Sequence, residues 1–367
     1  MMKNKIITFS FMLLLFSIAI LNVLTPPTMV SFAERRELHQ FEDLKIKKLL
    51  TGDFLEDFDA AALDQFILRD QFRRLKARVE NTILHKSDNN DIVVRGDNAF
   101  KLEYPLDEAS VTHFSATIKA ITDMYLDECQ VYFAMIPDKN YYVESDSDFL
   151  SMDYQKLDAL LHDSIKGMTI IDLKDTLILT DYYHTDPHWK QGHLDGVLER
   201  LRQEMELETD FSSIAYNTKS YAPFYGAYYG QSALNLAPDT IEYRVSEASS
   251  NAIVNNFEHM GDPDKAPGVY DEIKLGSIDS YDIFLSGSTP LVTIENPDSK
   301  SDKELIIFRD SFASSLAPLL IEEYQKITLI DLRYVSRELI GDFVNFEGSD
   351  VLFLYSTLII NHSNLLK

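Results

Sequence analysis

The stretch that decides the fold is Glu304-Leu305-Ile306-Ile307-Phe308-Arg309-Asp310-Ser311-Phe312. Its run of four apolar residues, 305–308, is typical of a buried strand. Asp310 and Ser311 follow that strand directly, and the sequence after them predicts a helix over 318–324. A strand, a short turn and a helix in this order predict one unit of a parallel sheet covered by helices. Because such sheets place their sites at the carboxyl ends of strands, the two polar residues are candidates for function.

Predicted strands and helices also alternate along the chain before and after this stretch. Apolar runs bounded by turn residues predict strands, and longer amphipathic patterns predict helices. The predicted strands are 91–95, 130–136, 168–172, 327–332 and 351–355, and the predicted helices are 111–126 and 154–166. Residues 201–290 show a less regular pattern, with a cluster of Tyr and Gly at 221–230. The fold class expected from this order is α/β with a mostly parallel sheet.

The first part of the chain has the pattern of an exported protein. Lys3 and Lys5 precede an apolar run over 6–24, and Pro26-Pro27 follows it. The run has about the length of a membrane span, which favours an uncleaved anchor with the two lysines inside. The alternative is a cleaved signal peptide with 31–33, Ser-Phe-Ala, as the cleavage site. We expect three parts: the anchor or signal peptide (1–33), a helical arm (34–88) and the main domain (89–367).

The composition of the chain argues against some classes of binding partner and of metal site. Asp and Glu number 59 against 34 Lys and Arg, a net charge of −25, which argues against nucleic acid because phosphates would be repelled. The single cysteine, Cys129, allows neither an intramolecular disulfide nor a metal site built on cysteines.

A carboxylate and an imidazole lie two residues apart at Asp186-Pro187-His188. In an extended segment their side chains share a face, so Asp186 can orient His188 as a general base. Ser311 is the candidate nucleophile, because it follows a strand and precedes a helix. Two alternatives remain: Asp310 and Ser311 are only helix caps, or His184, Asp186 and His188 bind a metal. No metal-binding motif such as H-E-x-x-H is present, so we predict no metal.

Several ordered stretches together resemble the DHHW proteins of Firmicutes, relatives of the bacterial alginate O-acetyltransferases in the SGNH hydrolase-like group. These stretches run from the apolar N-terminus almost to the C-terminus of the chain. They are 32–38, 64–72, 136–139, 183–189, 224–226, 308–312 and 330–334. The sequence differs from the family motif at Pro187, which stands where the family name expects a His.

The resemblance implies a three-layer α/β/α SGNH hydrolase-like fold with a mostly parallel sheet, beside the N-terminal helical arm and membrane anchor. It also implies a catalytic triad of Ser311, His188 and Asp186. Around this triad we expect oxyanion or substrate contacts from Gly226, Arg309, Tyr225 and Trp189. No cofactor is expected.

These observations predict an extracytoplasmic, membrane-anchored O-acyltransferase or esterase, with acetyl as the expected acyl group. Its expected substrate is a cell-surface or exported glycan, and a membrane protein is a candidate acyl donor. If the signal is cleaved, the protein is secreted instead. The alternative is a non-catalytic protein of the same fold that binds surface glycans or assists their assembly.

Overall fold

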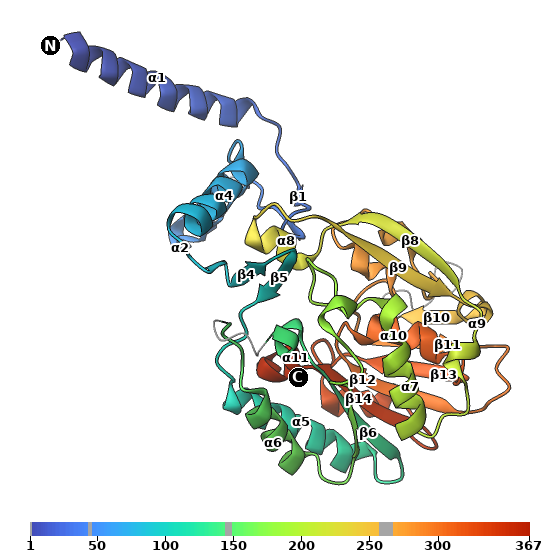
Figure 1. Cartoon of the computed structure of the whole chain (residues 1–367). Helices are drawn as coiled ribbons and strands as arrows, with labels where there is room; N and C mark the ends of the chain where they lie inside the picture. The colour runs from blue at the N-terminus through green and yellow to red at the C-terminus, as the bar shows by residue number, and fades with distance from the viewer. Residues whose placement is uncertain (1, 43–45, 144–148, 257–266) are drawn as a thin grey trace.

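The computed structural model describes residues 2–42, 46–143, 149–256 and 267–367 (Figure 1). Its centre is a seven-stranded sheet with strand order β10-β11-β13-β12-β14-β6-β7. The five strands from β13 to β7 are mutually parallel, and β11 and β10 extend one edge through antiparallel pairing. The strands are β6 (Gln130–Ile136), β7 (Thr169–Asp172), β10 (Ile253–Asn256), β11 (Leu291–Glu295), β12 (Glu304–Arg309), β13 (Lys326–Ile330) and β14 (Asp350–Ser356).

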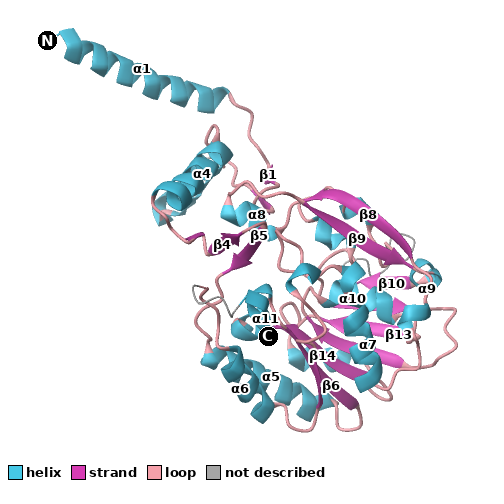
Figure 2. Cartoon of the chain, viewed as in Figure 1, coloured by secondary structure: helices cyan, strands magenta, loops and turns pink. Residues whose placement is uncertain are grey.

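Helices cover both faces of this sheet (Figure 2). The alternation of side chains along each strand sends one set to each face. On β12, Leu305 and Ile307 pack with α7 (Asp195–Glu204) and α10 (Ala313–Leu320), whereas Ile306 and Phe308 pack on the other side. That second core includes α5 (Glu108–Tyr125), α6 (Tyr154–Ser164) and α11 (Thr357–Asn361). The fold is therefore the expected α/β/α arrangement with a mostly parallel sheet.

The N-terminal helix α1 (Met2–Leu24) extends away from the rest of the protein in Figure 1. An 18-residue window within its segment Lys3–Leu24 has a mean hydropathy of 2.4, and the segment is long and apolar enough to cross a membrane. After it, β1 (Val30–Ser31) and β2 (Arg36–Glu37) pair as a short antiparallel hairpin. Residues 30–37 are called the post-anchor hairpin below.

The arm that follows differs in detail from the predicted continuous helical segment. It is divided into α2 (Ile46–Thr51), α3 (Asp53–Asp64), α4 (Arg69–Arg78) and a π-helical turn, Val79–Ile83. The breaks fall at Gly52 and Leu68, which both have left-handed backbone conformations. Apolar periodicity predicted the helical character of the arm, but it does not reveal the left-handed residues at which one helix ends and the next begins.

Three further predictions of local structure were inaccurate. The strand predicted at 91–95 is β4 (Ile92–Arg95), which belongs to a separate three-stranded sheet with β3 (Asp88–Asn89) and β5 (Asn98–Lys101). Helix α10 begins five residues earlier than predicted and contains Pro318. The irregular region contains a long hairpin, β8 (Asn217–Phe224) with β9 (Asp239–Val245), and the short helices α8 (Ala227–Ser232) and α9 (Glu247–Asn251).

Candidate active site

Ser311 lies in the turn between β12 and α10, at the carboxyl end of a central strand. The buried carboxylate of Asp310 holds this turn in place. Its Oδ1 accepts a hydrogen bond from the Phe312 amide at 3.0 Å, and its Oδ2 accepts one from the Ser356 amide at 2.8 Å. Because Ser356 ends β14, the turn is attached to two strands, while the Ser311 side chain remains partly exposed.

His188 lies near the tip of a tight loop that doubles back on itself. Tyr182 and Trp189 form an antiparallel bridge, and the Tyr183 amide donates to the His188 carbonyl at 3.1 Å. Asp186 and Pro187 occupy the turn between the two sides of this loop. The Asp-Pro-His sequence therefore forms a turn that places the carboxylate and the imidazole next to each other.

The three predicted side chains form one hydrogen-bonded line. His188 Nδ1 lies 2.6 Å from Asp186 Oδ1, and His188 Nε2 lies 2.7 Å from Ser311 Oγ. Asp186 is fully buried, and His188 is only 9% exposed. With a proton on Nδ1 donated to Asp186, Nε2 is free to accept the hydroxyl proton of Ser311. This geometry is within the hydrogen-bond reach required for proton transfer, about 2.6–3.2 Å.

The imidazole is held between two aromatic rings. The ring of Tyr281 stacks on His188 with a centroid distance of 3.8 Å and an angle of 10°, and Phe312 lies 4.8 Å away. The Tyr281 hydroxyl donates to Ser315 Oγ at 3.0 Å, which fixes the stacked ring to α10. Sequence reasoning did not identify Tyr281, because one tyrosine among 19 carries no signal of a partner far away in the chain.

Two groups satisfy the remaining oxygen of Asp186. The Ala227 amide donates to Oδ2 at 2.9 Å, and the guanidinium of Arg35 approaches it at 3.2 Å. Burial alone would raise the pKa of Asp186, but the charges of Arg35 and His188 and these hydrogen bonds hold it below its usual range. The carboxylate is therefore ionised at neutral pH. Arg35 was not among the predicted site residues.

Two buried charged residues hold the loop from the opposite side. Asp239 accepts hydrogen bonds from the His184 amide and from the amide and hydroxyl of Thr185. The Lys139 ammonium donates to three main-chain carbonyls, those of Ala99, Tyr183 and His184. Burial lowers the pKa of Lys139 to about 7, although Asp239 and Asp186 oppose this shift. Neither residue was predicted, because their partners are main-chain groups that a sequence motif does not reveal.

Gly226 does not have the free amide expected of an oxyanion donor. Its N–H donates to Thr185 Oγ1 at 2.9 Å, so the prediction for Gly226 was wrong in this respect. A Cβ at this position would lie 2.2 Å from the Thr185 carbonyl oxygen and 2.5 Å from Asp186 Cβ. The glycine therefore permits a close backbone approach that brings the Ala227 amide to Asp186. Tyr225 beside it is 42% exposed, and its ring lies 4.6 Å from that of Tyr229.

Arg309 and Trp189 also differ from the substrate contacts expected of them, because both are fully buried. Arg309 Nη1 donates to Ser314 Oγ at 2.6 Å, and burial lowers the pKa of the guanidinium. The Trp189 indole N–H donates to Ser315 Oγ at 2.9 Å. Both side chains therefore brace the first turns of α10 behind Ser311 and face the core rather than solvent.

The histidines near the motif pair with separate carboxylates. His184 Nδ1 lies 3.6 Å from Asp239, and His193 Nδ1 lies 2.9 Å from Asp181, apart from the Asp186–His188 pair. Among the described residues, no group of three His, Cys, Asp or Glu side chains is placed to hold a metal ion. The geometry gives no support to the alternative of a metal-dependent hydrolase.

Asp282 provides a test of the electrostatics around the site. Burial, followed by the charge of Asp279, raises the pKa of Asp282 to about 7, against about 3.9 in an unfolded chain. Between about pH 4 and pH 7 the folded state holds a proton that the unfolded state has lost, so stability falls as the pH rises through this window. We expect Asp282→Asn to stabilise the protein by on the order of 2–4 kcal/mol at pH 8, and by much less at pH 4.

Thermal unfolding of Asp282→Asn and wild type at pH 4 and pH 8 checks this expectation. The exposed Asp302 offers a matched control, Asp302→Asn, that should leave the difference between the two pH values unchanged. An equal gain in Tm at both pH values would contradict the assigned protonation of Asp282.

Comparison with known proteins supports the fold. No family model and no curated protein sequence matches this chain. A DHHW family protein from Eubacterium siraeum has a similar structure, with a TM-score of 0.62 and 17% identity, over 76% of this chain and 94% of that one. Bacillus cereus PatB1 aligns with a TM-score of 0.57 and 17% identity, over 75% of this chain and 97% of PatB1. Its structure with a sulfonyl adduct aligns with a TM-score of 0.56 and 16% identity, over 75% and 95%. The chain therefore shares its fold with a DHHW family protein, as the resemblance of the motifs predicted.

Proposed function

We propose that the protein is a serine O-acyltransferase or esterase that acts on a glycan outside the cytoplasmic membrane. The observation that carries this proposal is the line from Asp186 through His188 to Ser311, with distances of 2.6 and 2.7 Å. Serine becomes a useful nucleophile only when a base accepts its proton and a third group orients that base. All three roles have a candidate here, and the nucleophile is the most exposed of the three side chains.

The proposed reaction has two steps: acylation of Ser311 and transfer of the acyl group to an acceptor. Ser311 Oγ attacks the acyl carbon while its proton passes to His188 Nε2, and the bond from that carbon to the donor's oxygen breaks as His188 returns the proton to this oxygen. The acyl-enzyme then reacts with a sugar hydroxyl or with water, which loses its proton to His188. Ser311 leaves as the protonated hydroxyl. Asp186 stays ionised and stabilises the imidazolium that forms in each step.

The negative charge that develops on the acyl oxygen needs donors close to Ser311. The amide of Ser311 itself is the proposed donor, since within the described residues it donates to no protein acceptor. The exposed ring of Tyr225 and the partly exposed ring of Tyr229 are proposed glycan contacts, because aromatic faces stack on the apolar faces of sugar rings. Arg309 and Trp189 are assigned a supporting role behind the turn.

The N-terminal helix supports the proposed location. We propose that α1 is an uncleaved anchor, with Lys3 and Lys5 in the cytoplasm and the arm (34–88) and main domain (89–367) on the other side. On that side the accessible acceptors are exported or cell-surface glycans, and the acyl group must come from a donor that crosses or spans the membrane. No metal or organic cofactor is needed for this chemistry.

A sulfonyl fluoride tests the nucleophile directly, and PatB1 is recorded with a sulfonyl adduct. The full chain in detergent is expected to lose esterase activity on an activated acetyl ester in parallel with labelling. Mass spectrometry should place the sulfonyl group on the peptide that contains Ser311. Adding oligosaccharide acceptors and analysing them for acetyl groups separates transfer to sugars from hydrolysis.

Labelling elsewhere, with unmodified Ser311 in the inactivated protein, would exclude Ser311 as the nucleophile. Glycan binding without any turnover or labelling would instead favour the non-catalytic alternative. Prior incubation with unlabelled acetyl ester provides the control, because an acyl-enzyme should protect Ser311 from the sulfonyl reagent.

A further inference from the structure

Arg35, which lies in the post-anchor hairpin, reaches the carboxylate that orients the imidazole. Its Nη2 lies 3.2 Å from Asp186 Oδ2 and donates to the Tyr225 carbonyl at 3.0 Å. Its Nη1 donates to Asp279 Oδ2 at 2.9 Å. The side chain is 10% exposed, and its charge lies 5.3 Å from the centre of the Phe224 ring. The guanidinium of Arg35 therefore contacts Asp186 and Asp279, which lie about 150 and 240 residues farther along the sequence.

The backbone of the hairpin is shaped to direct Arg35 inward. Arg35 lies in the turn between β1 and β2 and has a positive φ of 52°. The turn packs closely on α8: a Cβ added to Gly230 would lie 1.2 Å from the Ala33 carbonyl oxygen. Gly230 thus allows the post-anchor hairpin to contact α8 directly, and a larger residue would force the two backbones apart.

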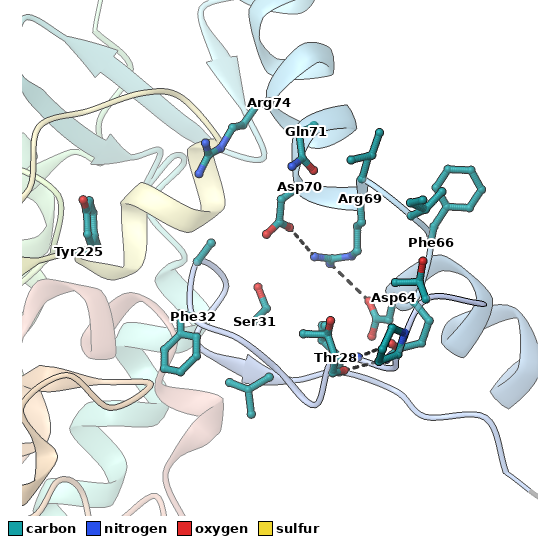
Figure 3. A pocket seen from close by; sticks show the side chains of 18 of the residues that line it. Thr28, Ser31, Phe32, Asp64, Phe66, Arg69, Asp70, Gln71, Arg74 and Tyr225 are labelled. Atoms are coloured by element: carbon teal, nitrogen blue, oxygen red, sulfur yellow. Dashed lines mark hydrogen bonds and ion pairs between the residues drawn. The ribbon is translucent and has the colours of Figure 1, made fainter. Parts of the chain in front are cut away.

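The arm holds the outer side of the same hairpin. Glu34 pairs with Arg69 and with Arg73, and Arg36 binds Asp64 through contacts of 2.6 and 2.7 Å. Figure 3 shows Asp64, Arg69 and Asp70 at the arm side of a pocket of about 700 Å³, with Ser31 and Phe32 of the hairpin on its other side. The hairpin therefore contacts the arm on one side and the main domain on the other.

The hairpin also limits how far the site lies from the anchor. Helix α1 ends at Leu24, and Arg35 follows eleven positions later. A fully extended chain of this length spans at most about 36–40 Å. If the anchor stays in the membrane, the Arg35 backbone must remain within that distance of the end of the anchor, and Asp186 lies one arginine side chain farther away.

We propose that Arg35 is a positioning residue and that the post-anchor hairpin completes the catalytic site of the main domain. This inference rests on the proposed function and assigns part of the site to a segment next to the anchor. Arg35 forms an ion pair with Asp186 Oδ2, and Asp186 Oδ1 remains directed at His188. It also compensates Asp279, a second carboxylate close to Asp186. The segment that links the protein to the membrane would then also set the geometry of its chemistry.

The charges around the pair determine the expected direction of a pH effect. The charged groups that act on Asp186 and His188 are Arg35, Asp279 and Asp282, and Lys139 interacts with Asp186 and with Asp239. Removing the positive charge of Arg35 leaves the carboxylates less compensated, so they stabilise the imidazolium form more strongly. The acidic limb of the pH profile of turnover should therefore move to higher pH.

The experiment compares Arg35→Ala, Arg35→Lys and Gly230→Ala in the full chain in detergent. Turnover of an activated acetyl ester is expected to fall about tenfold to a hundredfold in Arg35→Ala. Little change in KM is expected, because the Arg35 side chain is only 10% exposed and its guanidinium is engaged by protein groups. The acidic limb of kcat/KM should move to higher pH in Arg35→Ala and return in Arg35→Lys, which restores the charge. Gly230→Ala should lower kcat by displacing the hairpin, although Arg35 is unchanged.

A second readout does not depend on activity. The low-field proton NMR signal of the imidazole N–H bound to Asp186 should broaden or disappear in Arg35→Ala and Gly230→Ala. It should persist in Arg78→Ala, a matched control with the same charge change on the exposed surface of α4. Unchanged turnover, pH profile and NMR signal in Arg35→Ala would overturn the proposal. If the signal responds to Arg35→Ala but Ser311→Ala keeps full activity, the positioning role stands and the proposed reaction fails.

Discussion

Replacing Ser311 with alanine is expected to lower esterase or transferase turnover by at least about a thousandfold. The hydroxyl 2.7 Å from His188 Nε2 is the one protein group in the proposed mechanism that forms a bond to the acyl carbon. Alanine removes that bond and leaves the imidazole without a proton to accept. Residual activity above the uncatalysed rate would come from substrate binding and from the amides of the turn.

The folded state should tolerate this change. Ser311 is partly exposed, and the turn is held by Asp310 through the amides of Phe312 and Ser356 rather than by the Ser311 side chain. Steady-state kinetics of wild type, Ser311→Ala and the exposed control Ser220→Ala on β8 provide the measurement, with Tm as a check on folding. Turnover in Ser311→Ala equal to that of Ser220→Ala would exclude a serine mechanism at this position.

Sequence patterns predicted the five parallel strands of the central sheet because most of them are apolar on both faces, but they did not predict β10 and β11. The run at 130–136 matches β6, and the run 304–308 ends one residue before β12 does. Strand 91–95 was assigned to the wrong sheet because the same short pattern suits either a central strand or an edge hairpin. The early start of α10 was missed because Pro318 suggested a first turn, whereas the helix already begins at Ala313.

The candidate triad could be predicted because its residues carry local signals: a carboxylate and an imidazole around Pro187, and a serine after a strand. The surroundings of the triad could not, because their contacts join distant segments. Tyr281 stacks on His188, and Arg35 reaches Asp186 from the post-anchor hairpin. Arg309 was misassigned for a related reason: its neighbour Ser311 is partly exposed, but alternation along β12 sends the guanidinium into the core.

The substitution Asp186→Asn is expected to reduce kcat by about a thousandfold to ten-thousandfold with little change in side-chain size. The carboxylate has two oxygens in use: Oδ1 faces His188 Nδ1, and Oδ2 accepts from the Ala227 amide and contacts Arg35. An asparagine has only one acceptor oxygen. If its oxygen faces His188, its NH₂ group confronts two donors. If the NH₂ group faces His188 instead, it stabilises the tautomer that carries its proton on Nε2, which cannot accept the proton of Ser311.

Both orientations remove the negative charge that stabilises the imidazolium, so both slow the reaction, but they predict different costs in stability. The first leaves the partly buried Ala227 amide without an acceptor and removes one of the contacts of Arg35, which lowers stability by about 1–3 kcal/mol. The second keeps the fold and lowers only the rate. Tm and kcat measured together over pH 5 to 9 distinguish the two, and Asp302→Asn again serves as the exposed control. A rate within tenfold of wild type across this range would show that the imidazole does not need the charge of Asp186, and the proton-relay mechanism would then be wrong.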